Sequence, residues 1–281
     1  MKIRFWGVRG FYPASGQDYV RYGGNTAALE IVSDGGARIA IDFGTGAVPF
    51  GRSLLGAGFG AGKGVLPVLL SHTHLDHTAA MPFFVPVFIP GNRIDVYGAA
   101  SEHKLYDVLE ALFDPHVCPI NSQKNLNATI RVHDVADGPV AIDGFTVHAL
   151  RGPHGRATGV AWRIEADGKS VAIITAIDHP ATGPLPAAVE LARNVDLLLH
   201  DAAWHSKSDH YSQRWGGATA AMAVAVATLA GAQKLMLTHH APNHTDRDLD
   251  ALLAEAQAMS ERPVLAAMEG GHNAVITSSG M

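Results

Sequence analysis

Short apolar runs separated by glycine-rich turns fill the first third of the chain. Each run is about as long as a β-strand in a globular protein and is bounded by turn residues. The pattern predicts strands at residues 2–7, 27–32, 37–42 and 65–70. A glycine-rich connection, residues 56–64, joins a short helix to the last of these strands.

The remainder of the chain alternates strand-like runs with helical segments. Strands are predicted at residues 94–97, 130–135, 145–150, 160–166, 170–175, 195–200, 234–238 and 264–267. Helices are predicted at residues 101–112, with Ser101 as N-cap, over the alanine-rich segment 218–232, and at residues 246–259. Both halves of the chain begin with strands and end with a helix and a strand. This order favours two stacked sheets with helices outside and ligands at the strand ends.

A dense cluster of polar residues follows the apolar run 65–70: His72-Thr73-His74-Leu75-Asp76-His77. Because side chains alternate along an extended segment, His72 and His74 project together, and the turn that follows lets Asp76 and His77 approach a second point nearby. Three buried imidazoles and a carboxylate would each need a hydrogen-bond partner, so packing explains them poorly. The motif therefore predicts a site for two metal ions at the end of a buried strand.

Bulk composition limits the alternatives. With 47% hydrophobic residues, the 281-residue chain can bury a large core, and we expect one domain spanning residues 1–281. Cys118 is the only cysteine, which excludes an intrachain disulfide. No apolar stretch reaches the length of a membrane span, and the first strand is too short for a signal peptide, so a cytoplasmic location is expected.

The charge distribution argues against a large nucleic-acid substrate. The net charge is −5, and the 21 basic residues are scattered along the chain. A long RNA or DNA would need a continuous basic surface. We therefore expect a small-molecule substrate.

Two further histidines follow predicted strands and are candidate ligands. His154, in Gly152-Pro153-His154-Gly155, could complete a three-histidine site with His72 and His74. His239 could complete a second site with Asp76 and His77. The neighbouring His240 would point elsewhere, toward a ligand residue or the substrate.

These segments together give the chain a resemblance to a known family. They are Ile3-Arg4-Phe5-Trp6-Gly7-Val8-Arg9-Gly10, Tyr22-Gly23-Gly24-Asn25-Thr26, Asp42-Phe43-Gly44-Thr45-Gly46, Ser71-His72-Thr73-His74-Leu75-Asp76-His77, Pro82-Phe83-Phe84, Leu199-His200-Asp201-Ala202 and Thr238-His239-His240. The chain resembles the metallo-β-lactamase fold superfamily over nearly its whole length. Within it, the chain is similar to the phosphodiesterase-like branch related to ribonuclease Z and the phosphonate-pathway cyclic phosphodiesterases.

The resemblance implies an α/β fold, a four-layer αββα sandwich with the metal site at the strand ends between the two sheets. It implies two divalent metal ions, with zinc expected and manganese or iron as alternatives, and a bridging hydroxide as nucleophile. Asp76 would then be both ligand and catalytic residue. Asp42 would orient a ligand histidine. Homodimers are frequent among related folds, and the oligomeric state stays open.

The chain departs from the family pattern at the expected bridging aspartate. The best alignment places Ala176 there, in Ile174-Thr175-Ala176-Ile177-Asp178-His179. Asp178 lies two positions later, which keeps the same face of an extended segment, and a local bulge could absorb the offset. Asp178 is therefore a candidate metal ligand, and His179 is a weaker one.

A second departure concerns the proton donor for the leaving group. In ribonuclease Z-like relatives a His-Ser-Thr segment supplies it, paired with an acidic residue. Here Asp201 keeps the acidic position, but Gly217-Ala218-Thr219 replaces the histidine segment. Asp201 and His210 are the candidate proton-handling residues, with His205 as an alternative on the same loop. Both histidines are equally compatible with exposed loop positions.

Three functional hypotheses follow from these observations. The first is a metal-dependent hydrolase of a small phosphodiester or cyclic phosphate; the added basic arm that ribonuclease Z enzymes use for tRNA has no counterpart between His154 and His200. The second is an acyl hydrolase that cleaves a lactone, thioester, ester or lactam on the same fold. The third is a non-catalytic metal-binding sensor that has lost the bridging aspartate and the acid.

Overall fold

A computed structural model describes residues 1–120, 122, 125–206, 217–270 and 274–275 and places them in two facing β-sheets. The first sheet has the order β14 (Ala274–Val275), β1 (Lys2–Gly7), β2 (Ala28–Val32), β3 (Arg38–Ile41), β4 (Val65–Leu69), β5 (Arg93–Gly98) and β6 (Thr129–Asp134). The second has the order β13 (Val264–Ala266), β12 (Leu235–Thr238), β11 (Leu197–Asp201), β10 (Lys169–Ile174), β9 (Ala157–Ala166), β8 (Phe145–His154) and β7 (Gly138–Ile142).

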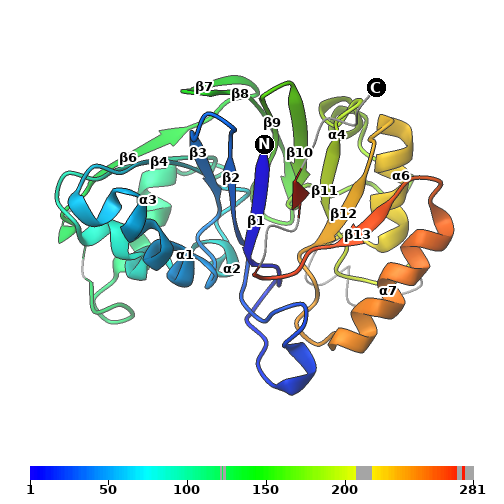
Figure 1. The fold of residues 1–281 in the computed structure, drawn as a ribbon, viewed down its shortest axis with the longest axis horizontal. Helices are drawn as coiled ribbons and strands as arrows, with labels where there is room; N and C mark the ends of the chain where they lie inside the picture. The colour runs from blue at the N-terminus through cyan, green and yellow to red at the C-terminus, as the bar shows by residue number, and fades with distance from the viewer. Residues whose placement is uncertain (121, 123–124, 207–216, 271–273, 276–281) are drawn as a thin grey trace.

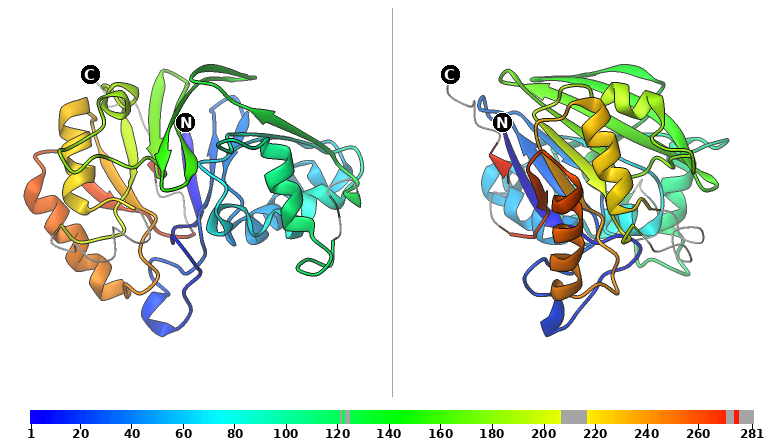
Figure 2. Two further views of the ribbon diagram at one scale, coloured as in Figure 1. Left: turned by 180° about the vertical axis from the view of Figure 1, so that it is seen from behind. Right: turned by 90° about the vertical axis from the view of Figure 1, so that its right-hand side faces the viewer.

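Helices cover the outer face of each sheet. Figure 1 shows α1 (Ala47–Leu54), α2 (Leu75–Thr78) and α3 (Leu105–Glu110) beside the first sheet, and α4 (Pro186–Leu191), α6 (Ala220–Ala230) and α7 (Asp246–Met259) beside the second. The views in Figure 2 show the same four layers from behind and from the side. The predicted αββα sandwich is confirmed. Within the described ranges, every helix falls short of the length and apolar character that crossing a membrane requires.

Each sheet changes from antiparallel to parallel pairing partway across. In the first sheet β1, β2 and β3 pair antiparallel and β3 to β6 pair parallel. In the second, β7 to β10 pair antiparallel and β10 to β13 pair parallel. Parallel strands end at the same edge of a sheet, so the loops that follow β3, β4, β10, β11 and β12 gather at one end of the molecule.

Successive side chains of β11 alternate between two apolar core clusters, one on each face of the second sheet. Leu197 and Leu199 pack in the cluster between the two sheets, whereas Leu198 belongs to the cluster between the second sheet and its helices. Such two-sided burial is typical of a central parallel strand. Trp162 is fully buried between the sheets, and its indole N–H donates to the carbonyl of Leu70, 3.1 Å away.

Most predicted elements were located correctly, including β1 and α7 at their exact bounds. Three differ. β7 was not predicted, and β8 extends to His154, so this histidine ends a strand instead of lying in a loop. The helix predicted from Ser101 begins at Leu105, because the carboxylate of Asp134 accepts the backbone N–H of Leu105 at 2.9 Å and caps the helix there.

Replacing Trp162 with phenylalanine is expected to lower the free energy of unfolding by about 2–4 kcal/mol. The change leaves a cavity between the sheets and a buried carbonyl at Leu70 without its donor. Urea unfolding would measure the effect. Trp6→Phe is the matched control, because the indole nitrogen of Trp6 has no hydrogen-bond partner to lose. Equal losses in the two variants would show that the bond to Leu70 contributes nothing.

Candidate metal centre

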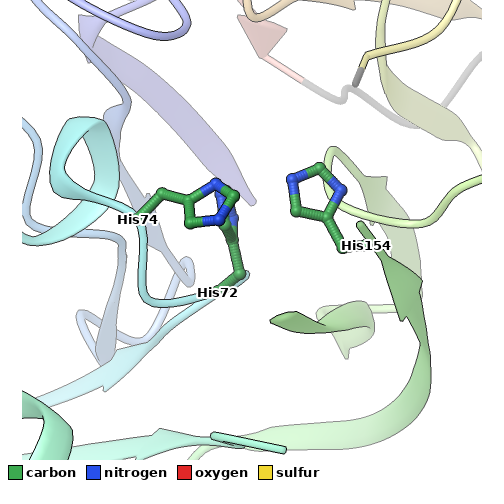
Figure 3. A group of neighbouring side chains, drawn as sticks. All are labelled: His72, His74 and His154. Carbon is green, nitrogen blue, oxygen red and sulfur yellow. The ribbon is translucent and has the colours of Figure 1, made fainter. Parts of the chain in front are cut away.

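Three imidazole rings meet where β4 and β8 end. His72 follows β4, His74 precedes α2, and His154 is the last residue of β8. One ring nitrogen from each lies within 4.8 Å of the others, and Figure 3 shows the ring of His154 facing those of His72 and His74 from the opposite sheet. His72 and His154 are buried, while His74 is exposed. The predicted three-histidine group is thus assembled from both sheets.

A second donor group lies beside the first. Nε2 of His77 is 3.2 Å from Oδ2 of Asp76 and 3.1 Å from Nε2 of His239, and Nε2 of His239 is 3.2 Å from the same Oδ2. The donor atoms of His72, Asp76 and His77 also lie within 4.8 Å of one another, so the two groups adjoin. The structure therefore brings together six of the seven predicted metal ligands.

The backbone conformation at His239 places its ring in the second donor group. His239 has a φ of 56°, in the left-handed region that residues with a Cβ seldom adopt. Gly10 makes room for its ring, because a Cβ at Gly10 would stand 2.2 Å from the imidazole. The backbone N–H of Phe11 donates to Oδ2 of Asp76 at 2.6 Å and fixes the carboxylate. Sequence inspection missed these roles of Gly10 and Phe11, although both lie in or next to the family-like opening segment.

The second group fits a small divalent cation. Tetrahedral coordination at about 2.0–2.1 Å places two ligand atoms about 3.3 Å apart, close to the observed 3.1–3.2 Å. Three acceptor atoms at these separations repel one another unless a proton or a cation lies among them. Imidazole nitrogen and carboxylate oxygen are the ligands that zinc, manganese and iron accept.

A buried carboxylate and a hydroxyl orient the ligand rings. Oδ2 of Asp42 is 2.8 Å from Nδ1 of His77 and accepts the hydroxyl of Ser71 at 2.9 Å. The Ser71 hydroxyl oxygen lies 3.2 Å from Nδ1 of His72 and 3.0 Å from Nδ1 of His77. Since the Ser71 hydroxyl donates its proton to Asp42, the Ser71 oxygen is free to accept a hydrogen bond from Nδ1–H of His72. Both rings then present Nε2 to a metal, and one hydroxyl contacts a ligand of each donor group.

The acidic residues also set the protonation of the metal-free centre. Burial alone would lower the pKa of His77, but the adjacent carboxylates of Asp76 and Asp42 raise it to about 10. Burial opposes ionisation of Asp76, yet the neighbouring His77 and His239 hold the pKa of Asp76 well below its usual value. Without a metal, the ring of His77 therefore carries a proton at neutral pH.

Asp178 lies next to the three-histidine group. Its Oδ1 is 3.2 Å from Nδ1 of His154, and its Oδ2 accepts the backbone N–H of Gly155 at 2.7 Å. Burial works against ionisation, but these two bonds lower the pKa of Asp178. In this position its carboxylate orients His154, as a carboxylate partner of a ligand histidine does. Ala176, where the resemblance expects the bridging aspartate, is buried.

Asp201 ends a chain of hydrogen bonds that runs from the partly buried His179 through the buried His200. Nδ1 of His179 accepts the backbone N–H of Leu185 at 3.0 Å, and Nδ1 of His200 donates to the carbonyl of Asp201 at 2.8 Å. The two Nε2 atoms lie 3.1 Å apart, so the proton between them belongs to His179. Burial and the nearby His200 lower the pKa of His179 to about 4. The contact between the two rings fastens the segment after β10 to β11.

Asp201 itself is buried and ionised. Burial raises its pKa, but the nearby ring of His200, whose Nδ1 lies 3.2 Å from Oδ1, the nearby His239 and the backbone N–H of Ala218, 2.7 Å from Oδ2, together lower it. Asp201 thus lies beside segment 217–219, as the resemblance predicts, but its low pKa suits a base or a hydrogen-bond acceptor better than an acid.

Aromatic rings occupy the space beside Gly217, where the resemblance expects the proton donor. A Cβ added there would lie 3.3 Å from the indole nitrogen of Trp204 and 3.5 Å from the ring of Phe11, and φ is +84°. The Cβ of Ala203 would be 3.2 Å away, so a histidine here would need Ala203 and Trp204 to shift by a few tenths of an ångström, and its backbone conformation would be strained. His210 lies outside the described residues. Nδ1 of His205 is 2.6 Å from Oε2 of Glu255, a partner that sequence inspection did not identify.

Comparison with known proteins supports a metal-binding role for these donor groups. The family model of the beta-lactamase superfamily domain matches residues 60–240. The chain belongs to this superfamily, and it is a hydrolase of the metallo-β-lactamase fold.

The relatives are similar over almost the whole chain. Ribonuclease Z of Archaeoglobus fulgidus is 25% identical over 317 aligned positions, which cover 94% of this chain and 95% of that protein. Among solved structures, the metallo-β-lactamase fold protein YhfI of Bacillus subtilis superposes with a TM-score of 0.68 at 21% identity, covering 96% and 97% of the two chains. A diphosphatase of the PhnP family gives a TM-score of 0.66 at 17% identity, covering 96% of each chain. The resemblance inferred from the sequence motifs is confirmed.

Replacing Ser71 with alanine is expected to weaken metal binding at the three-histidine group by about 10- to 100-fold. His72 loses the acceptor for its Nδ1 proton, whereas His77 keeps its direct bond to Asp42. Calorimetric titration with Zn²⁺ would therefore show one class of sites weakened more than the other. Ser53→Ala, which removes a hydroxyl bonded to a helix carbonyl, is the control. Equal weakening of both classes would contradict the assignment.

Metal binding is expected to release protons and to tighten as the pH rises. Because the raised pKa of His77 is about 10, a metal must displace its proton at any lower pH, and affinity should increase up to about tenfold per pH unit below that value. Titration in buffers of different ionisation enthalpy counts the protons. Asp42→Asn removes one carboxylate that raises this pKa, so fewer protons should be released. Affinity that does not change between about pH 6 and pH 9 would refute the expectation.

Proposed function

We propose that this hydrolase cleaves a small phosphodiester or cyclic phosphate at a centre of two zinc ions, with manganese or iron as alternatives. The observation that carries the proposal is the adjacency of the two donor groups, in which His72 of the three-histidine group lies within 4.8 Å of Asp76 and His77 of the second. When bound, two such ions would supply a hydroxide nucleophile at neutral pH and offset charge on the phosphoryl oxygens.

The residues of the chain would position and polarise this centre. His72, His74 and His154 would hold one ion, and Asp76, His77 and His239 the other. Asp178 would orient His154, and Asp42 would orient His77. Asp201 would accept a hydrogen bond or a proton on the side of His239, whose proximity lowers its pKa.

The chain between His154 and His200 is compact, and this favours a small substrate. After His154 the chain makes the β9–β10 hairpin, whose turn at Asp167 and Gly168 is only two residues long. It then passes through α4 to β11. No described residue between His154 and His200 belongs to an arm that extends from the sheet to hold a long RNA. We further infer that residues 1–281 form one domain, because side chains of both sheets share a single core cluster.

A substrate screen of the metal-loaded protein tests the proposal. Hydrolysis of bis(p-nitrophenyl) phosphate or a cyclic nucleotide is expected, with two metal ions per chain by elemental analysis. Asp76→Asn should lower kcat/KM more than about 100-fold, because it removes a ligand charge from the centre.

The same screen separates the alternatives. Activity confined to lactones, thioesters, carboxylic esters or nitrocefin would replace the phosphodiester assignment with an acyl one. A chain that binds one metal ion or none and hydrolyses nothing would indicate a metal-binding sensor. Asp114→Asn, at an exposed carboxylate far along the chain from the donor groups, is the control for loss of charge.

A further inference from the structure

A fully buried arginine joins two loops behind the second donor group. Nε of Arg9 donates to the carbonyl of Gly23 at 2.7 Å, and its Nη1 donates to the carbonyls of Ala241 and His244 at 3.1 and 2.7 Å. Arg9 lies just after β1, whereas Ala241 and His244 belong to the loop after β12 that begins with His239. One side chain thus connects the opening segment of the chain to the loop that carries a metal ligand.

The surroundings of Arg9 are unfavourable for a cation. In the described part of the chain its hydrogen bonds all go to main-chain carbonyls, and its Nη2 has no hydrogen-bond partner. Burial lowers the pKa of Arg9 and the charge of Asp246 opposes this shift, but a guanidinium stays charged at neutral pH. A buried charge without a paired carboxylate costs free energy. The carbonyls that it holds therefore account for the arginine better than packing does.

Main-chain bonds pair the same two segments. The N–H of Gly10 donates to the carbonyl of His240 at 3.0 Å, and the N–H of His240 donates to the carbonyl of Val8 at 2.9 Å. This pairing sets Gly10 against the ring of His239, at the place where a Cβ would collide with the imidazole. The side chain of Arg9 adds a second set of bonds between the segments and fixes the pairing from behind.

Both segments hold a strained residue that contacts the second donor group. Phe11 has a φ of 67° and donates its N–H to Oδ2 of Asp76, and His239, with a φ of 56°, supplies its own Nε2. Left-handed backbone at residues with a Cβ persists only where surrounding contacts fix it. Arg9 precedes Phe11 by two residues and holds the loop directly after His239. Its loss would therefore let both conformations relax, and two of the three donor side chains would move.

We propose that Arg9 is a positioning residue that sets the affinity of the second donor group for its metal ion. The inference rests on the two-metal centre of the proposed function. Arg9 acts through the backbone of Phe11 and His239, without touching a donor atom. Ser71 and Asp178 orient the three-histidine group instead, so the affinity of that group should not depend on Arg9.

Titration of the metal-free protein with Zn²⁺ tests the role of Arg9. Arg9→Met is expected to weaken one class of sites by about 10- to 100-fold and to leave the other class unchanged. Arg9→Lys keeps the charge, but one ammonium cannot reproduce the fork that reaches three carbonyls, so its affinity should fall between those of Arg9→Met and the wild type. In Co²⁺-loaded protein, the visible absorption of the weakened site should change as well.

Arg163→Met is the matched control. Nη1 of Arg163, on β9, donates to the carbonyls of Leu191 and Arg193 at 3.0 and 2.8 Å, at the end of α4 and away from both donor groups. This variant should lower the thermal stability and leave both classes of metal sites unchanged. If Arg9→Met weakened the two classes equally, or neither, or if Arg163→Met gave the same pattern as Arg9→Met, the proposed role of Arg9 would be overturned.

Hydrogen exchange in the metal-free protein tests the positioning without any metal. The amides of Phe11 and His240, bonded to Asp76 and Val8, should exchange at least about tenfold faster in Arg9→Met, while the amides of β9 keep their rates. Unchanged exchange at Phe11 and His240 would overturn the role of Arg9 and leave the proposed function intact. A wild type that binds fewer than two ions would overturn the proposed function, and exchange would still decide whether Arg9 fixes this backbone.

Discussion

The carboxylate of Asp42 is the contact on which the centre depends. It accepts the backbone N–H and the hydroxyl of Ser71 at 2.7 and 2.9 Å, and it contacts Nδ1 of His77 at 2.8 Å. These bonds join the end of β3 to both ends of the histidine motif. Asp42 holds a left-handed φ of 62°, a conformation that costs about 1 kcal/mol or more and persists only where surrounding contacts fix it. A single buried anion thus sets the orientation of ligands in both donor groups.

The two sheets contribute unequally to the centre, and this explains why its parts are far apart in sequence. The first sheet supplies a continuous motif, His72 to His77, because one strand end and one short helix can place several ligands in succession. The second sheet supplies one histidine at the end of β8 and another after β12. The indole of Trp162 bonds to the carbonyl of Leu70 just before the motif, so packing between the sheets also fixes the distance between ligands.

Much of this arrangement could be predicted from sequence because its signals are local. Apolar runs and turn residues predicted most strands, and the spacing from His72 to His77 indicated candidate ligands that the structure brings together. Asp178 illustrates the limit: the sequence placed it near the centre, but only the pairing of β8 with β9 and the turn of the chain after β10 put its carboxylate against His154. Gly217 is a similar case, since no sequence pattern reveals that Ala203, Trp204 and Phe11 lie beside it.

The net charge of the ligand residues bears on which class of substrate the centre favours. If two divalent ions are held as proposed, four positive charges face one ligand carboxylate, that of Asp76, because Ala176 and the three-histidine group add none. Asp42 and Asp178 lie behind the ligand rings and Asp201 lies near His239, so these carboxylates offset the charge only at a distance. Such a centre attracts an anion more strongly than a neutral carbonyl, since opposite charges interact strongly where water is excluded. A phosphodiester brings that negative charge with it, whereas a lactone or a neutral ester does not, and this difference favours phosphoryl over acyl substrates.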